Sequence, residues 1–351
     1  MASAAVSSPA PKSVLLWKIG ALGDVLMTTP LVRQLRGQLP HARIDYLVGR
    51  GARAVLQGNP HIDAVRDFDE RILFGAQVHR LGEVLALLRG YERIYVLDKH
   101  WIFGWLARAA GIPQRIGFRR RAVEGWPHTL QVAYGGLRHE IDYYLDLAEV
   151  SGLPVDRHDR AMELPPAEPF ALPQPYVVAI NSGGNNPGEA SELRKLPAPL
   201  FAGLVEALAA RTPVVFLGSP EERAGYEALT ARHGARNLCG RTSLRQAWDV
   251  LAHAEAVYTT DTGLMHMAGA CNPNVVAVFG PTHPLRKCPP GVRWVWRDEE
   301  RYDPRYDLFG TLLRGRYFER MAVADIVEWA QPAPLDRQQN MEGALCPSRH
   351  Q

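Results

Sequence analysis

Cysteine is scarce in this 351-residue chain, where Cys239, Cys271, Cys288 and Cys346 are widely scattered. No two of them form a CxxC pair, and none has a histidine at zinc-finger spacing. The sequence therefore indicates neither a disulfide framework nor a metal site. We interpret the four thiols as structural or inert, which is the usual behaviour of free cysteine.

Long hydrophobic runs are also missing. No stretch approaches the roughly 18 uninterrupted apolar residues of a membrane-spanning helix. Residues 1–12 lack the basic start and apolar run of a secretory signal. We therefore expect a cytoplasmic protein, and this leaves room for peripheral contact with the cytoplasmic face of the inner membrane.

An excess of one charge is absent too, because 40 basic side chains stand against 37 acidic ones. The net charge of +3 is too small to argue for nucleic acid as a partner. A composition with 46% hydrophobic and 22% charged residues is that of an ordinary globular protein. The length favours two domains, because a single core serves roughly 100 to 200 residues.

Apolar runs alternate with helical patterns along the first half of the chain. Such alternation predicts an α/β domain, a parallel sheet covered by helices on both faces. The expected strands cover 13–19, 42–48 and 93–97, and the expected helices cover 25–39, 81–88, 101–110 and 139–150.

The pattern breaks off at 151–175, a proline-rich stretch typical of an interdomain connection. It then starts again in the second half, with strands expected at 176–180, 213–217, 256–260 and 274–279 and helices at 201–210, 244–254 and 264–271. We predict two Rossmann-like domains, 13–165 and 166–330, that face each other across a cleft. The polar ends, 1–12 and 331–351, are expected to be disordered tails.

Each half opens with a buried strand that runs into a glycine turn. Because parallel sheets bind ligands beyond the carboxyl ends of their strands, these turns should line the cleft. The first turn reads GALGD and does not fit GxGxxG, so it gives no dinucleotide fingerprint. Its Asp24 stands at the start of a helix. It is either a general base that accepts a proton from a hydroxyl or an acid placed for the helix dipole.

The sequence DTGLMH forms another turn between a strand and a helix. Thr262 and the backbone amides near Gly263 suit a phosphate oxygen, because a helix N-terminus attracts anions. His266 lies about one turn further along and can point at the same group. Asp261 would repel phosphate, so a sugar hydroxyl suits it better. The alternative is an Asp cap followed by a core histidine.

Three more turns and one basic cluster belong to the prediction. Ser182, Gly183 and Gly184 form a glycine turn, and the nearby Arg194 and Lys195 could neutralise a diphosphate. The turn GSPEER brings carboxylates to a strand end, where a ribose could bind, and GPTH ends a later strand. The cluster Arg115, Arg119, Arg120 and Arg121 suits an anionic acceptor, although such runs are often plain surface. Asp67-Phe68-Asp69 has DxD spacing, but in its charged setting we reject it as a metal site.

Taken with their order, these motifs make the chain resemble the bacterial heptosyltransferases, glycosyltransferase family 9. The similarity runs from about Val14 to Trp329. It is strongest in KIGALGDVLMTTPLVRQLR and in AEAVYTTDTGLMHMAGACNPNVVAVFGPTHP, with GNPHID, RIGF and LCGRTSL between them.

The resemblance implies a GT-B fold and an inverting, metal-independent transfer from a nucleotide-diphosphate sugar, typically ADP-heptose. It implies that Asp24 is the base and that Lys195 stabilises the departing diphosphate. For the donor it implies Ser182, Gly183, Gly184, Glu222, Asp261, Thr262, Gly263 and His266, with Glu222 at the ribose. We place Gly23, Arg119, Arg120 and Arg121 on the acceptor side and expect neither a metal nor a cofactor.

One departure from the family pattern concerns the donor. Members often carry a tryptophan beside the lysine, whereas this chain reads Arg194-Lys195-Leu196-Pro197. Another sugar or nucleotide therefore stays open. The expected function is transfer of a heptose or related sugar to lipopolysaccharide core or another surface glycan, part of lipopolysaccharide biosynthesis. The alternatives are a nucleotide-sugar epimerase of related architecture and a non-catalytic nucleotide-sugar-binding protein.

Overall fold

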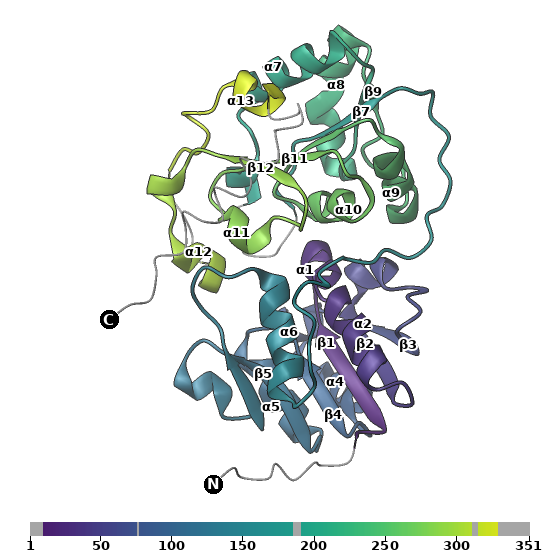
Figure 1. Cartoon of the computed structure of the whole chain (residues 1–351), viewed down its shortest axis with the longest axis vertical. Helices are drawn as coiled ribbons and strands as arrows, with labels where there is room; N and C mark the ends of the chain where they lie inside the picture. Colours follow the sequence, from purple (N-terminus) through teal and green to yellow (C-terminus); the bar gives the residue numbers. More distant parts are fainter. Residues whose placement is uncertain (1–9, 76, 185–190, 311–314, 329–351) are drawn as a thin grey trace.

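A computed structural model describes residues 10–75, 77–184, 191–310 and 315–328 of the chain. Two α/β lobes lie one above the other, with the front lobe in purple and blue and the rear lobe in green and yellow (Figure 1). We define the front lobe as residues 13–150 and the rear lobe as residues 177–328. In the described part of the chain, no helix is long and apolar enough to cross a membrane.

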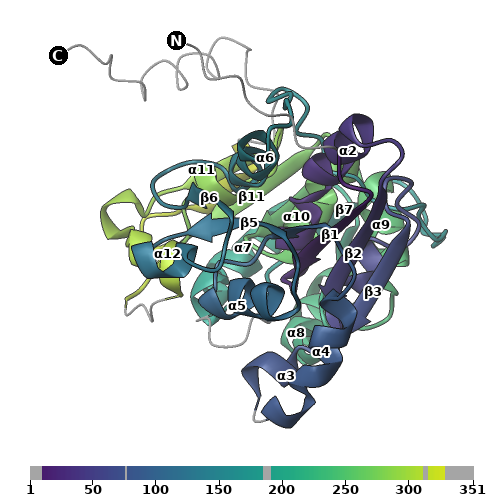
Figure 2. The same cartoon turned by 90° about the horizontal axis from the view of Figure 1, so that it is seen from below.

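The front lobe contains a six-stranded parallel sheet in the order β3-β2-β1-β4-β5-β6. In Figure 2, α2 and α6 lie on one side of this sheet and α4 and α5 on the other. The strands are β1 (Ser13–Lys18), β2 (Arg43–Gly49), β3 (Ala64–Phe68), β4 (Arg93–Val96), β5 (Gln114–Arg119) and β6 (Leu130–Ala133). The helices are α1 (Leu22–Leu26), α2 (Thr29–Gln38), α3 (Arg71–Phe74), α4 (Leu81–Leu88), α5 (Trp101–Ala109) and α6 (Glu140–Val150).

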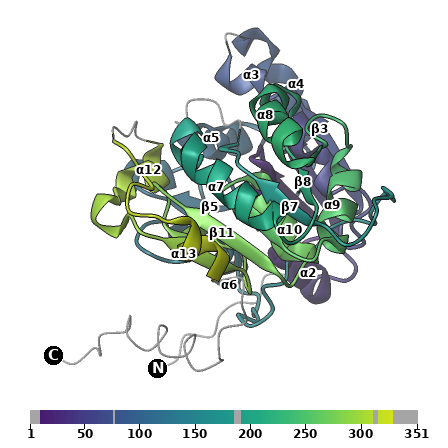
Figure 3. The same ribbon diagram turned by 90° about the horizontal axis from the view of Figure 1, so that it is seen from above.

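The rear lobe repeats the design with the order β12-β11-β10-β7-β8-β9, again all parallel. Figure 3 shows its helices from above. The strands are β7 (Val177–Ile180), β8 (Val214–Phe216), β9 (Arg236–Asn237), β10 (Val257–Thr260), β11 (Val275–Phe279) and β12 (Arg293–Trp296). The helices are α7 (Ala198–Ala209), α8 (Arg223–His233), α9 (Leu244–His253), α10 (Gly263–Cys271), α11 (Pro284–Lys287), α12 (Pro304–Phe309) and α13 (Val323–Glu328).

Apolar side chains on both faces of each strand explain why both sheets are fully covered. Val177 and Ala179 of β7 join the core under α7 and α8, whereas Val178 and Ile180 join the opposite core, which contains α9 and α10 residues. Successive residues of a strand point to opposite faces, so a continuous apolar run fills two cores at once. In each lobe the strand order reverses beside the first strand, and ligands bind at such a point in open α/β sheets.

The connection between the lobes has no helix or strand over residues 151–176. Its first part bonds to the front lobe, where the Glu163 amide donates to Thr29 Oγ1 at 2.9 Å. By Glu168 and Phe170 the chain bonds to α9, through the carbonyl of Arg245 and the carboxylate of Asp249. The chain therefore changes lobes between Glu163 and Glu168.

The structure confirms the fold class and the strands expected from the sequence, with differences of detail. The single helix expected over 25–39 is two helices, because a new helix begins at Thr29 with Pro30 in its first turn, and the Thr28 hydroxyl bonds back to the Val25 carbonyl. Strands β3, β5, β6, β9 and β12 were not predicted. Pro11 is buried and the Lys12 amide donates to Glu92, so order begins before residue 13. The rest of the two expected tails, 1–9 and 331–351, lies outside the described residues.

Candidate active site

Asp24 lies in the first turn of α1, immediately beyond β1. Its side chain is 25% exposed and lies between two ammonium groups. Lys18 Nζ is 3.6 Å from Oδ2, and Lys287 Nζ, from the rear lobe, is 3.3 Å from Oδ1. The carboxylate therefore faces the junction between the lobes.

The charge on Asp24 is held firmly by its surroundings. Burial alone would raise its pKa, but the positive charges of Lys287, Lys18 and Lys99 outweigh burial and hold the pKa well below its ordinary value. The same ion pairing raises the pKa of Lys287 well above its ordinary value, against the effect of burial. Asp24 is ionised at neutral pH, but while Lys287 stays in contact it is a weak base.

Glu140 is the centre of a buried charged cluster that joins the lobes. At the start of α6 it accepts from Lys99 Nζ at 2.7 Å and from Arg286 Nη2 of the rear lobe at 2.9 Å. The Tyr134 hydroxyl also donates to it. Burial would raise the pKa of Glu140, but Lys99 and Lys287 lower it to about 2. Cations from two lobes thus share one carboxylate, which fixes α11 and its Lys287 against the front lobe.

Helices α1 and α10 touch at two glycines. A Cβ added to Gly23 would lie 2.2 Å from Cδ2 of His266, and one added to Gly263 would lie 3.2 Å from Leu22. The first approach leaves no room for a Cβ, and the second leaves little. His266 therefore packs directly beside the turn that carries Asp24.

The DTG turn joins β10 to α10, and its cap is Thr262, not the Asp cap considered as the alternative. Thr262 caps α10, with its Oγ1 accepting from the Leu264 amide at 3.3 Å. Burial lowers the pKa of His266 to about 4, so the ring is neutral, and its buried Nδ1 has no hydrogen-bond partner among the described residues. Asp261 is also buried, with Arg194 Nε 3.9 Å from its carboxylate. The buried Asp261 thus serves partly to orient a neighbouring cation.

A second group of predicted donor residues lies apart from this junction. A cavity of about 1190 Å³ in the rear lobe is lined by Gly184, Lys195 and Glu222, with Tyr226 and Tyr317 among the other lining residues. Lys195 Nζ bonds to Glu192 at 2.7 Å. Glu222 Oε2 accepts from the Ser219 amide at 2.9 Å and so closes its own turn. The cavity is large enough for a nucleotide.

Ser182 and Gly183 lie between the two groups, where β7 and β10 end side by side. Ser182 is buried, its amide donates to Thr260 Oγ1 at 3.0 Å, and its hydroxyl accepts from the Gly184 amide at 3.4 Å. Gly184 has a φ of +74°, which favours glycine. This pairing fixes the edge of the rear sheet that links the cavity to the DTG turn.

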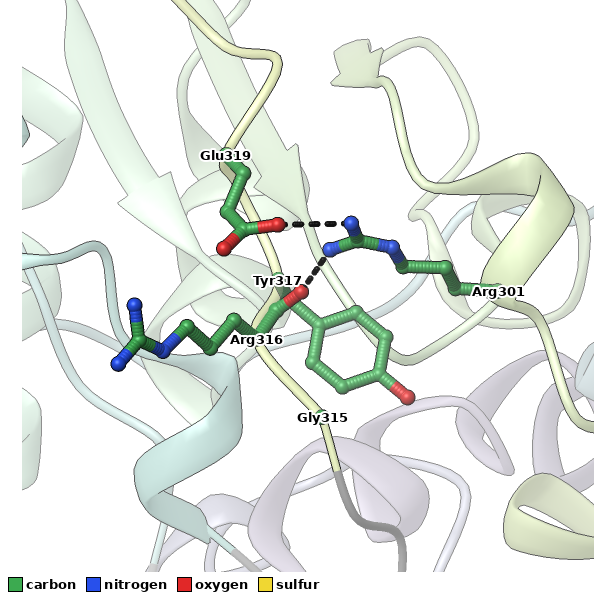
Figure 4. A pocket seen from close by; sticks show the side chains of 5 residues that line it. All are labelled: Arg301, Gly315, Arg316, Tyr317 and Glu319. Atoms are coloured by element: carbon green, nitrogen blue, oxygen red, sulfur yellow. Dashed lines mark hydrogen bonds and ion pairs between the residues drawn. The ribbon is translucent and has the colours of Figure 1, made fainter.

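A smaller hollow of about 480 Å³ adjoins that cavity and shares Gly315, Arg316, Tyr317 and Glu319 with it (Figure 4). Arg301 closes one side of it by bonding to Glu319 at 2.7 Å and to the Arg316 carbonyl. These ion-paired groups line the end of the larger cavity.

The basic cluster divides into structural and exposed members. Arg120 pairs with the buried Glu124 at 3.0 Å and donates to the Leu308 carbonyl of the rear lobe at 3.1 Å. Arg115 is bonded to the carbonyl of Pro127 at 2.7 Å. Arg119 and Arg121 are exposed. The structure thus leaves two arginines of this cluster open to an acceptor.

The rejected DxD segment is also accounted for. Asp67 is ion-paired with Arg53 at 2.5 Å, and Asp69 with Arg71 at 2.6 Å. Among the described residues, no three His, Cys, Asp or Glu side chains form a group suited to a metal ion.

Sequence reasoning missed the cations around Asp24 and their partner Glu140. Lys18 carried a signal, because a lysine inside an apolar strand needs a carboxylate partner. Lys287 and Glu140 carried none, since their roles depend on how the lobes meet.

Comparison with known proteins agrees with this architecture. Residues 78–298 match glycosyltransferase family 9 (heptosyltransferase). The chain belongs to this family. Lipopolysaccharide heptosyltransferase 2 of Escherichia coli K12 is 30% identical over 293 residues, which cover 75% of this chain and 81% of the relative. Lipopolysaccharide heptosyltransferase 1 of Pseudomonas aeruginosa is 26% identical, over 77% of this chain and 79% of the relative.

Solved structures show the same fold as this family 9 enzyme. The structure of E. coli ADP-heptose lps heptosyltransferase II superposes with a TM-score of 0.69 at 20% identity, covering 94% of this chain and 99% of that one. The E. coli heptosyltransferase WaaC with ADP-2-deoxy-2-fluoro heptose also gives 0.69, at 17% identity and with 90% and 98% coverage. The family 9 chain therefore has the GT-B fold and is a glycosyltransferase.

Proposed function

We propose that this family 9 enzyme transfers a heptose from ADP-heptose to a hydroxyl of a lipopolysaccharide core, with inversion at the anomeric carbon and without a metal ion. The observation that carries the proposal is the position of Asp24, at the junction of the lobes, beside His266 and opposite Lys287. The names of the E. coli and P. aeruginosa relatives support heptose as the transferred sugar and lipopolysaccharide as the acceptor.

The proposed reaction is a single displacement. The acceptor hydroxyl attacks the anomeric carbon, the bond from that carbon to the diphosphate breaks, and Asp24 takes the hydroxyl proton. The donor nucleotide would lie in the rear cavity, with Glu222 at the ribose, and the diphosphate would lie by Ser182, Gly183, Gly184 and the DTG turn. Lys195, Arg194 and Lys287 provide positive charge for the leaving diphosphate.

The contact between Lys287 and Asp24 implies an order of events in the proposed reaction. While it contacts Asp24, that carboxylate is too weak a base, so Lys287 must turn toward the donor phosphates as the donor binds. Asp24 would then regain basicity in the complex that needs it. One cation would thus serve two groups in turn.

Two further expectations stay predictions. One is a cytoplasmic protein in peripheral contact with the membrane, and the other is an acceptor that binds at Arg119 and Arg121.

The test is incubation with ADP-heptose and heptose-free core fragments, with the product followed by mass spectrometry and its anomeric configuration by NMR. We expect a one-heptose mass gain, inverted configuration and unchanged turnover in the presence of EDTA. Donor alone separates the alternatives, because an epimerase would isomerise it without acceptor, and a binding protein would leave it intact in both reactions. Retention of configuration would contradict the proposed single displacement.

A further inference from the structure

Three tryptophans are exposed on one side of the front lobe. Trp101, Trp105 and Trp126 are 49%, 43% and 71% exposed, whereas Trp17, Trp248 and Trp296 are buried. Exposing large aromatic rings to water is unfavourable, and a group of them marks an interaction surface.

The exposed rings belong to two segments that pack against each other. Trp101 and Trp105 are four residues apart on α5, so they share one face of the helix with Arg108. That helix packs beside Pro127, because a Cβ on Gly104 would lie 2.6 Å from Pro127 Cγ, and Trp126 precedes that proline.

The surface continues across the junction to the rear lobe. The guanidinium of Arg121 lies 5.3 Å from the ring of Phe309 in α12, and Phe309 is itself exposed. Figure 2 shows α5 and α12 on the same side of the molecule. Both lobes therefore contribute to it.

This surface also carries charge of one sign. Between residues 99 and 139 the only acidic side chain is Glu124, which is buried and paired with Arg120. Of the basic side chains in the same segment, Arg108, Arg119 and Arg121 are exposed, whereas Lys99, Arg120 and Arg138 are ion-paired with Glu140, Glu124 and Asp146. The segment is thus more positive than the whole chain, whose net charge is +3.

We propose that the surface formed by α5, residues 119–126 and Phe309 docks on an anionic phospholipid bilayer. Tryptophan rings suit the boundary between headgroups and acyl chains, and arginines beside them attract anionic headgroups. A protein partner would fit the aromatic rings equally well, but the single sign of the charge favours an anionic membrane. Docking through both lobes would hold the cleft next to the bilayer, where a lipid-linked acceptor lies. This last consequence rests on the proposed function, whereas the docking does not.

The experiment is co-sedimentation of the full chain with vesicles that contain neither glycolipid nor donor. One set contains phosphatidylglycerol and phosphatidylethanolamine, and the other only phosphatidylcholine. We expect the protein to bind the anionic set at low salt and to be released as salt rises. Trp101→Ala/Trp105→Ala/Trp126→Ala should weaken binding at least tenfold, and Arg108→Glu should remove the preference for anionic vesicles.

The controls are Val150→Ala, an exposed apolar residue at the end of α6, and Arg236→Glu/Arg241→Glu, an exposed basic pair on the rear lobe. Neither should change binding. If the triple variant unfolds, Trp126→Ala alone replaces it, because that ring is the most exposed of the three. Equal binding of the tryptophan variants and the wild type, or no binding of the wild type, would overturn the proposal. The triple variant could instead bind vesicles normally but show a raised KM for a soluble core fragment. This result would also overturn the proposal, because it would assign the surface to the acceptor glycan.

Discussion

Lys287 of the rear lobe places its ammonium 3.3 Å from the carboxylate of Asp24, 263 residues earlier in the chain. This contact joins the lobes at the point where a transferred proton would be accepted. It also lowers the basicity of Asp24, so the proposed mechanism requires the two residues to separate before Asp24 accepts a proton.

Replacement of Asp24 tests the base directly. Asp24→Asn keeps the size of the side chain but removes its basicity, so kcat should fall about 10²- to 10⁴-fold. Donor affinity, measured by calorimetry with ADP, should change only a few-fold. Asp142→Asn is the matched control, because Asp142 has the same 25% side-chain exposure and lies on α6, paired with Arg160. Unchanged turnover in Asp24→Asn would rule out the base assignment.

The Lys287 contact predicts a shift in pH dependence. Lys287→Met removes the main cation that lowers the pKa of Asp24, so this pKa should rise toward its ordinary value. Because the ionised carboxylate is the active form, the acidic limb of kcat/KM in the free enzyme should move to higher pH. Lys287→Arg keeps the charge and should leave the limb nearly in place. An identical acidic limb in wild type and Lys287→Met would show that Asp24 does not depend on this contact.

The close approach of α1 and α10 predicts a steric effect. Gly23→Ala introduces a Cβ 2.2 Å from the His266 ring, so the lobes must shift at the junction. We expect more than a tenfold loss of transfer, because a displacement of about 1 Å costs on the order of 10²-fold in rate. Gly37→Ala in α2 is the control, since nothing lies within 4 Å of that Cβ and alanine favours a helix. Full activity of Gly23→Ala would mean that the contact is not needed.

Two neighbouring arginines should behave differently. Arg120→Ala leaves the buried Glu124 without its side-chain partner, so the free energy of unfolding should fall by about 1–3 kcal/mol. Arg119→Ala/Arg121→Ala removes exposed charge and should leave that energy within about 0.5 kcal/mol. The double variant should instead raise the KM for a soluble anionic acceptor and lessen its salt dependence. Denaturant titration and acceptor kinetics together separate the roles. Equal stability losses would contradict the division.

Asp307 predicts how stability changes with pH. Burial raises its pKa from 3.8 to about 6, so the folded protein binds this proton more tightly than the unfolded chain. Its contribution to stability is therefore present below pH 4 and is lost as the pH rises through about 6. Between these two pH limits, the contribution of Asp307 to the free energy of unfolding falls by about 3 kcal/mol. Asp307→Asn should flatten the stability profile between about pH 4 and 6, whereas the more exposed Asp303→Asn should not. A profile unchanged by Asp307→Asn would contradict this.

Local patterns were enough to predict the two lobes and the turns at their strand ends. The apolar run at 13–19 predicted β1 because a strand buried on both faces needs continuous apolar residues. The DTG turn was recognisable because a β-branched strand precedes it and a helix rich in Ala, Leu and Met follows it, but its cap is Thr262 and not the Asp considered from the sequence. Short edge strands such as β9 were not predicted, because they have too few residues for a periodic pattern.

The site was recognised only in part. Asp24 and His266 could be named because each stands in a turn at a strand end. Lys287 and Glu140 could not, because no spacing in the sequence relates residues 24, 140 and 287.

By itself, the amino-acid sequence determined two parallel sheets, their glycine turns and the family to which the chain belongs, since periodicity and turn chemistry act between near neighbours. The tertiary structure alone decided that Lys287 faces Asp24, that Arg120 supports a buried Glu124, and that the exposed tryptophans share one surface. Those relationships depend on how the lobes and their helices pack, because electrostatic forces and steric contacts act through space, whatever the distance along the chain.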